Sequence, residues 1–139
     1  MKQEIKTKWE GNMLFHANNP GGSLKIDADA AHGGSGQGLR PKALMLTALA
    51  GCTGLDVVSL FKKMRIEVEG IEIDVQADLT EEQPTYYNKV KVIYKFYGKD
   101  FEKEKIEKAV KLSQDKYCGV SEMFRRFSEL SYEILYFEK

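Results

Sequence analysis

The chain has no net charge, few cysteines and few prolines. Lys and Arg together number 21, as do Asp and Glu, and the sequence pI is about 6.7. This balance gives no electrostatic basis for binding nucleic acid or an anionic membrane surface. The first residues, MKQEIKTKWEG, contain no apolar segment and no small-residue cleavage site, so they do not predict export. We therefore expect a cytoplasmic protein without nucleic-acid or membrane partners.

Two common types of ligand site are also missing from the sequence. The Gly-rich segment DAAHGGSGQGL at 29–39 matches neither GxxxxGK[ST] nor GxGxxG, so it predicts a flexible loop and no phosphate site. His16, His32 and the two cysteines could supply four metal ligands in principle, but they show no CxxC or HxxxH spacing. We therefore expect no metal site.

The hydrophobic pattern of the 139 residues predicts a single domain, 1–139, of α+β class. Residues 71–79 and 89–97 alternate between apolar and polar side chains and are expected to pair as antiparallel strands. Shorter strands are predicted at 2–9, 13–17, 23–26 and 130–137, and further helices at 101–117, with Asp100 as N-cap, and 120–127. The expected order is N-terminal strands (1–28), Gly-rich loop (29–40), central helix (41–65) and a β-β-α-α-β segment (66–139).

The central helix is apolar on every face. Between Ala43 and Phe61 its only charged residue is Asp56, Pro41 suits its first turn, and basic residues end it. A helix of this kind is a buried core helix or a membrane span, and about 19 weakly polar residues could just cross a bilayer. We favour the buried helix because the charge is costly in a membrane and the amphipathic strands need a surface to cover. Two glycines in its middle, Gly51 and Gly54, predict the close approach of another helix.

The two cysteines, Cys52 and Cys118, lie in the middle of this helix and at the end of a later one. A lone cysteine in an apolar helix is usually a small buried hydrophobe, but a pair can cycle between two thiols and a disulfide. The spacing does not show whether the two meet. Asp56 lies one turn after Cys52, where its charge would raise the thiol pKa, so we interpret it as a capping or interface residue.

Two motifs resemble the OsmC/Ohr family, the osmotically inducible and organic hydroperoxide resistance proteins. PKALMLTALAGCTGLDVV at 41–58 resembles the family's central helix, and Cys118-Gly119-Val120-Ser121 resembles its second motif, Cys-Pro-Val-Ser. The GCTGLDVV form is most similar to the less characterised OsmC-like branch. The resemblance implies an intertwined homodimer in which antiparallel sheets wrap the paired central helices. It also implies a peroxidase without metal or cofactor, in which Cys52 attacks an organic hydroperoxide, Cys118 resolves the sulfenic acid as a disulfide, and a dithiol reduces it.

The chain departs from the family pattern at the residues that activate the thiol. Lys42 replaces the glutamate that follows the proline, and no arginine precedes Arg40, which is the nearest candidate for the activating cation. Twelve helical residues span about 18 Å, so Arg40 could reach Cys52 only from the other subunit or by folding back. Gly119 stands where the family has proline. The alternative function is a binding protein for a small apolar ligand, with Cys52 as a packing residue and its thiol pKa above about 8.5.

Overall fold

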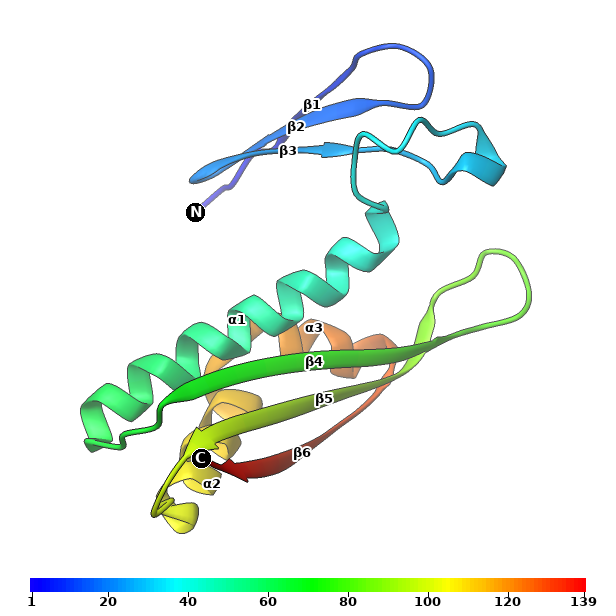
Figure 1. Ribbon diagram of the computed structural model, residues 1–139. Helices are drawn as coiled ribbons and strands as arrows, with labels where there is room; N and C mark the ends of the chain where they lie inside the picture. The colour runs from blue at the N-terminus through cyan, green and yellow to red at the C-terminus, as the bar shows by residue number, and fades with distance from the viewer. The chain divides into compact units, whose positions relative to one another are not determined.

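The computed structural model describes all 139 residues, which form two compact units, Met1–Met45 and Leu46–Lys139. In the first unit, β1 (Lys6–Trp9), β2 (Phe15–Asn19) and β3 (Gly22–Ile26) form an antiparallel sheet in sequence order (Figure 1). The tight turn between β2 and β3 places Gly21 at φ 91°, a left-handed conformation that favours glycine. The three expected N-terminal strands are therefore present, with bounds shifted by a few residues.

The Gly-rich segment after β3 is folded around one buried carboxylate. Asp27 accepts hydrogen bonds from the backbone N–H groups of Ala28, Ser35 and Gln37 and from the Ser35 hydroxyl. Burial opposes the charge of Asp27, but these hydrogen bonds outweigh it and hold the carboxyl pKa below its usual value. A Cβ at Gly34 would lie 1.6 Å from the Ala28 carbonyl oxygen. The segment, which we expected to be a flexible loop, is thus held in one conformation that includes the short η1 (Ala30–His32).

The second unit carries a mixed sheet with the strand order β4–β5–β6 (Figure 1). The strands β4 (Gly70–Leu79) and β5 (Tyr87–Gly98) pair antiparallel, as expected, but β6 (Glu129–Glu138) is parallel to β5. The expectation that the sheets are wholly antiparallel is therefore wrong for this last strand. The crossover through α2 (Lys103–Leu112), η2 (Ser113–Tyr117) and α3 (Gly119–Phe127) returns the chain to the end of the sheet where β5 begins. The α+β class itself is confirmed.

Helices pack against one face of this sheet and form the core. Alternate residues of β5 are fully buried because they point at the helices: Val90, Val92, Tyr94 and Phe96. The helices contribute Leu49, Val57 and Phe61 from α1 (Pro41–Met64), Ile106, Ala109 and Val110 from α2, and Phe124 from α3. Phe96 is at the centre, with ring centroids 5.3 Å from Phe61 and 6.2 Å from Tyr136.

Helix α1 buries only one stripe within this chain. Its buried residues, Leu49, Thr53, Val57 and Phe61, recur every fourth position. Leu55 and Val58 on the other side are 75% and 54% exposed. The helix is long and apolar enough to cross a membrane, the only one in the chain of which this is true, and 22% of its most apolar window is buried. The expected all-round burial is thus not provided by one chain.

The two glycines of α1 differ in what they face. A Cβ at Gly54 would lie 3.1 Å from Ile73 Cδ1, so this glycine makes room for a side chain of β4. A Cβ at Gly51 would meet nothing within 4 Å. The predicted approach of a second helix at this glycine therefore remains a prediction.

Two expected helix boundaries are wrong in detail. Asp100 has a left-handed φ of 50°, and the N-cap of α2 is Glu102. The predicted helix at 101–117 ends as a π turn, η2, and Cys118 is the N-cap of the next helix. Gly119 is accordingly the first residue of α3 and does not terminate the preceding helix.

Candidate active site

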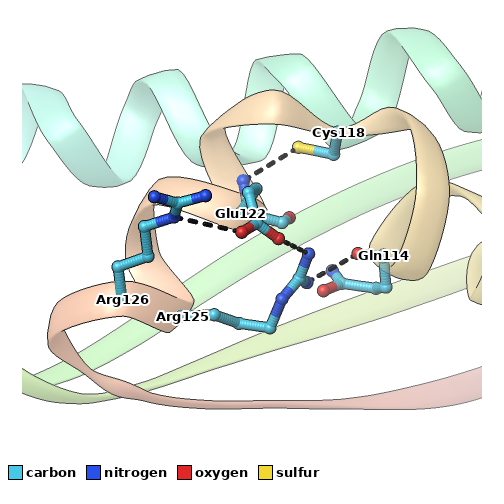
Figure 2. Close-up of polar contacts among 6 residues, drawn as sticks. Gln114, Cys118, Glu122, Arg125 and Arg126 are labelled. Atoms are coloured by element: carbon cyan, nitrogen blue, oxygen red, sulfur yellow. Dashed lines mark hydrogen bonds and ion pairs between the residues drawn. The ribbon is translucent and has the colours of Figure 1, made fainter.

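Cys118 is fixed at the N-terminus of α3 by hydrogen bonds on both sides. Its sulfur accepts from the backbone N–H of Ser121 at 3.3 Å (Figure 2). Its own N–H donates to the Ser113 carbonyl at 2.8 Å. The side chain is buried, with 3% exposure. The sulfur thus acts as the N-cap acceptor of α3.

Cys52 lies against the same helix end. Its thiol is close enough to the Cys118 thiol and to the backbone N–H of Val120 for both to influence its pKa. Both cysteines are free thiols, and Cys52 is the more exposed of the two. The structure therefore brings together two cysteines that lie 66 positions apart in the sequence, the more accessible one on α1 and the buried one at the N-cap of α3.

The surroundings of Cys52 disfavour its thiolate. Burial raises the pKa of this thiol, and the neighbouring Cys118 and the Asp56 carboxylate raise it further. The hydrogen bond from Val120 lowers the pKa but does not offset the other effects. At neutral pH, Cys52 is consequently a protonated thiol in this environment.

This shift predicts how the reactivity of Cys52 depends on pH. Only the thiolate reacts with an alkylating agent, so the rate for Cys52 in a Cys118→Ser protein should increase with pH and reach its midpoint above about 8.5. Asp56→Asn removes one source of the shift, so its midpoint should be lower than that of the parent. Rates of iodoacetamide modification followed by intact mass test both statements. A midpoint below the ordinary thiol value would contradict them and would indicate that a cation from outside this chain faces Cys52.

A buried chain of hydrogen bonds runs beside the thiols. Thr53 lies 2.6 Å from the Tyr94 hydroxyl and 2.7 Å from the Ser113 hydroxyl, oxygen to oxygen. Ser113 donates to Asp56 at 2.9 Å, and the Gln114 amide donates to Tyr94 at 2.7 Å. Apart from the partly buried Asp56, all these residues are at most 3% exposed. The chain joins α1, β5 and η2 within the second unit.

The Asp56 carboxylate fixes the direction of every bond in this chain. A carboxylate only accepts, so the single hydroxyl proton of Ser113 is donated to it and Thr53 must donate to Ser113. Tyr94 must then donate to Thr53, while its oxygen accepts from the Gln114 amide. Burial raises the pKa of Tyr94, which keeps its hydroxyl protonated as this arrangement requires. Asp56 is therefore the end point of a buried network, a role that we did not predict from the sequence.

The third predicted site residue, Arg40, belongs to the first unit. Its guanidinium donates to the carbonyl oxygens of Gly38, at 3.0 Å, and Asp27, at 3.4 Å. These bonds hold the end of the Gly-rich segment at the start of α1. The carboxylate whose charge acts on Cys52 is that of Asp56, on the same helix.

A second arginine supports the α3 segment from the side. Arg125 donates to the Gln114 carbonyl at 2.6 Å and to Glu122 at 2.8 Å, while Arg126 lies 3.1 Å from the other Glu122 oxygen (Figure 2). The two arginines hold the pKa of Glu122 below its usual value. Arg125 thus ties α3 to the π turn that precedes Cys118.

Comparison with known proteins identifies relatives of this chain in sequence and in fold. The model of the family described as OsmC-like protein matches residues 34–133. Protein YhfA of Escherichia coli (strain K12) is 28% identical over 135 residues, which are 95% of this chain and 98% of YhfA. The crystal structure of a hypothetical protein from Aquifex aeolicus VF5 has 29% identity and a TM-score of 0.81, over 98% of both chains. The organic hydroperoxide resistance protein OhrB of Bacillus subtilis shares the fold, with 21% identity and a TM-score of 0.67, over 96% of this chain and 98% of OhrB.

Proposed function

Because the chain belongs to the OsmC-like protein family, we propose that it is a thiol-dependent peroxidase that reduces organic hydroperoxides in defence against oxidative stress. The observation that carries the proposal is the proximity of two free thiols, Cys52 and Cys118, which are close enough to influence each other's ionisation. A relative with the same fold, OhrB of Bacillus subtilis, is named for resistance to organic hydroperoxides. The same pair of cysteines had suggested this chemistry in the sequence.

In the proposed cycle, Cys52 attacks and Cys118 resolves. The Cys52 thiolate attacks the outer peroxide oxygen, the O–O bond breaks, and the products are a sulfenic acid on Cys52 and, after protonation, an alcohol. The Cys118 thiol then displaces the hydroxyl group of the sulfenic acid, giving a disulfide and water. A dithiol reductant returns both cysteines to thiols. Cys52 is suited to the first role because it is the more exposed of the two.

We also propose that the protein works as a cytoplasmic homodimer. In such a dimer the apolar α1, which is long and apolar enough to cross a membrane, would serve as a core helix. Packing of α1 against its copy in a second chain would cover Leu55 and Val58 and fill the open side of Gly51. Across such a dimer, Arg40 is the proposed residue that would face the thiol of the other subunit and orient the hydroperoxide for attack.

The test is consumption of an organic hydroperoxide with dithiothreitol as the reductant. The proposal predicts turnover of cumene hydroperoxide that increases from pH 7 to pH 9, because the attacking species is the Cys52 thiolate. The controls are reactions without protein and with protein alkylated at its thiols. A rate equal to that of either control would contradict the proposal.

A specific observation favours the second function, a binding protein for a small apolar ligand. The raised pKa of Cys52 is what a packing residue would show, and α1 presents apolar side chains that this chain leaves exposed. This function predicts no hydroperoxide consumption at any pH, and equal affinity for an apolar fluorescent probe in the parent and in Cys52→Ala. The peroxidase remains our first choice because packing alone does not require a second thiol close to the first.

A further inference from the structure

One buried serine connects the two segments that carry the cysteines. The hydroxyl of Ser113 donates to Asp56 at 2.9 Å and lies 2.7 Å from the Thr53 hydroxyl, which donates to it. Both partners are on α1, one and four residues after Cys52. The carbonyl of the same serine accepts the N–H of Cys118 at 2.8 Å. Ser113 therefore links the backbone of Cys118 to the helix turn that bears Cys52.

The geometry around Ser113 leaves it a single orientation. Its proton is committed to Asp56 and its lone pair to Thr53, so a rotation of its side chain would break both bonds inside the core. Ser113 is also the first residue of the π turn η2, and such turns interrupt regular helices frequently at functional sites. The first two residues of this turn, Ser113 and Gln114, belong to the polar chain, and Cys118, which follows the turn, is the N-cap of α3.

We propose that Ser113 is a positioning residue for the second chemical step, in which it holds Cys118 against Cys52 while the disulfide forms. This inference rests on the proposed two-cysteine function. In that step the sulfur–oxygen bond of the Cys52 sulfenic acid breaks and a sulfur–sulfur bond forms. The hydroxyl group leaves with the proton of the Cys118 thiol as water. Ser113 touches no reacting atom and acts through the position of the Cys118 backbone.

The inference predicts that Ser113→Ala separates the two steps. The variant loses both hydrogen bonds to α1 but keeps the backbone carbonyl that holds Cys118. Loss of two buried hydrogen bonds should lower the effective concentration of one thiol at the other by about tenfold. Formation of the sulfenic acid, which involves Cys52 and the hydroperoxide alone, should change much less.

Equilibration with glutathione redox buffers measures the effective concentration directly, without any hydroperoxide. The proteins are the parent, Ser113→Ala and the matched control Ser128→Ala. The control also loses one serine hydrogen bond, to the Phe124 carbonyl at 2.6 Å, at the far end of α3. We expect about a tenfold shift toward the dithiol for Ser113→Ala and none for Ser128→Ala. Equal equilibria in the two variants would overturn the inference.

A second pair of variants tests the same connection from its partly exposed end. Asp56→Asn and Asp56→Ala both remove the charge, but only asparagine keeps an oxygen that can accept from Ser113. The inference predicts a weaker disulfide in Asp56→Ala than in Asp56→Asn, and equality would overturn it even if Ser113→Ala did not fold. The proposed function is tested separately, by sulfenic acid in Cys118→Ser after a stoichiometric hydroperoxide. Absence of the acid would refute the peroxidase whatever the glutathione equilibria show.

Discussion

Replacing Cys52 with serine is expected to abolish hydroperoxide consumption. The serine hydroxyl remains protonated at every accessible pH and is a far weaker nucleophile than a thiolate, so the first step has no attacking atom. The loss should be complete, to the rate of the reaction without protein. Consumption of cumene hydroperoxide with dithiothreitol, followed for both proteins at pH 8.5, measures it.

Cys118→Ser is the informative comparison for this result. It retains the attacking thiol, so one equivalent of hydroperoxide should still be consumed rapidly, and later turnovers should depend on direct reduction of the sulfenic acid by the added thiol. Equal activity of Cys52→Ser and the parent would show that Cys52 is not the attacking residue. Equal steady-state rates for Cys118→Ser and the parent would show that Cys118 does not resolve the intermediate.

Phe96→Ala is expected to lower the free energy of unfolding by about 3–5 kcal/mol, the usual cost of truncating a buried phenylalanine. The side chain is fully buried at the centre of the core and packs against Phe61 of α1 and Tyr136 of β6. Its removal leaves a cavity between the sheet and α1. Urea unfolding followed by circular dichroism measures the change, at one protein concentration for all variants because a dimer's stability depends on it.

Phe137→Ala provides the matched control on the neighbouring strand. This phenylalanine is 40% exposed and stacks on Tyr97 at 5.1 Å between ring centroids, so its loss should cost about 1 kcal/mol. A smaller effect for Phe96→Ala than for Phe137→Ala would contradict the placement of the core on the helical face of β5.

The order of elements in this fold could be predicted from the sequence because the hydrophobic periods are clear. The alternation at 71–79 and 89–97 and the apolar stretch at 41–65 match β4, β5 and α1 to within two residues. The direction of β6 could not be predicted, because an alternating strand reads the same whether its partner is parallel or antiparallel. The π turn was also missed. A polar residue such as Ser113 on the apolar face of a helix interrupts the hydrophobic pattern, but it does not indicate which residue would accept its hydrogen bond.

The candidate site residues came from a resemblance. The resemblance to the OsmC/Ohr family pointed to Cys52 and Cys118, which the structure places close enough to influence each other, and their catalytic roles stay a prediction. The network of Thr53, Tyr94 and Ser113 was not anticipated. Tyr94 and Ser113 lie 41 and 60 residues after Thr53 in the sequence, and only the folded chain brings them together. One signal was available: Ser113 continues the spacing of Ile106 and Val110, which placed a hydroxyl in line with core residues.

The exposed side of α1 explains why the helix looked wholly buried in the sequence. Leu49 and Val57 serve the core of this chain, whereas Leu55 and Val58 face outward. Apolar residues occur in a sequence wherever a side chain is buried in the working protein, whether by its own chain or by a second subunit. The apolar residues that this chain leaves exposed are accordingly the ones we assign to the proposed dimer.

Intact mass after one equivalent of cumene hydroperoxide tests the central claim, the two-cysteine cycle, most directly. The reduced parent protein should lose two hydrogen atoms as Cys52 and Cys118 form a disulfide. Cys118→Ser should gain one oxygen, which a sulfenic-acid reagent such as dimedone then captures on Cys52. Unchanged masses of both proteins, with the hydroperoxide still present, would contradict the peroxidase and favour the binding protein.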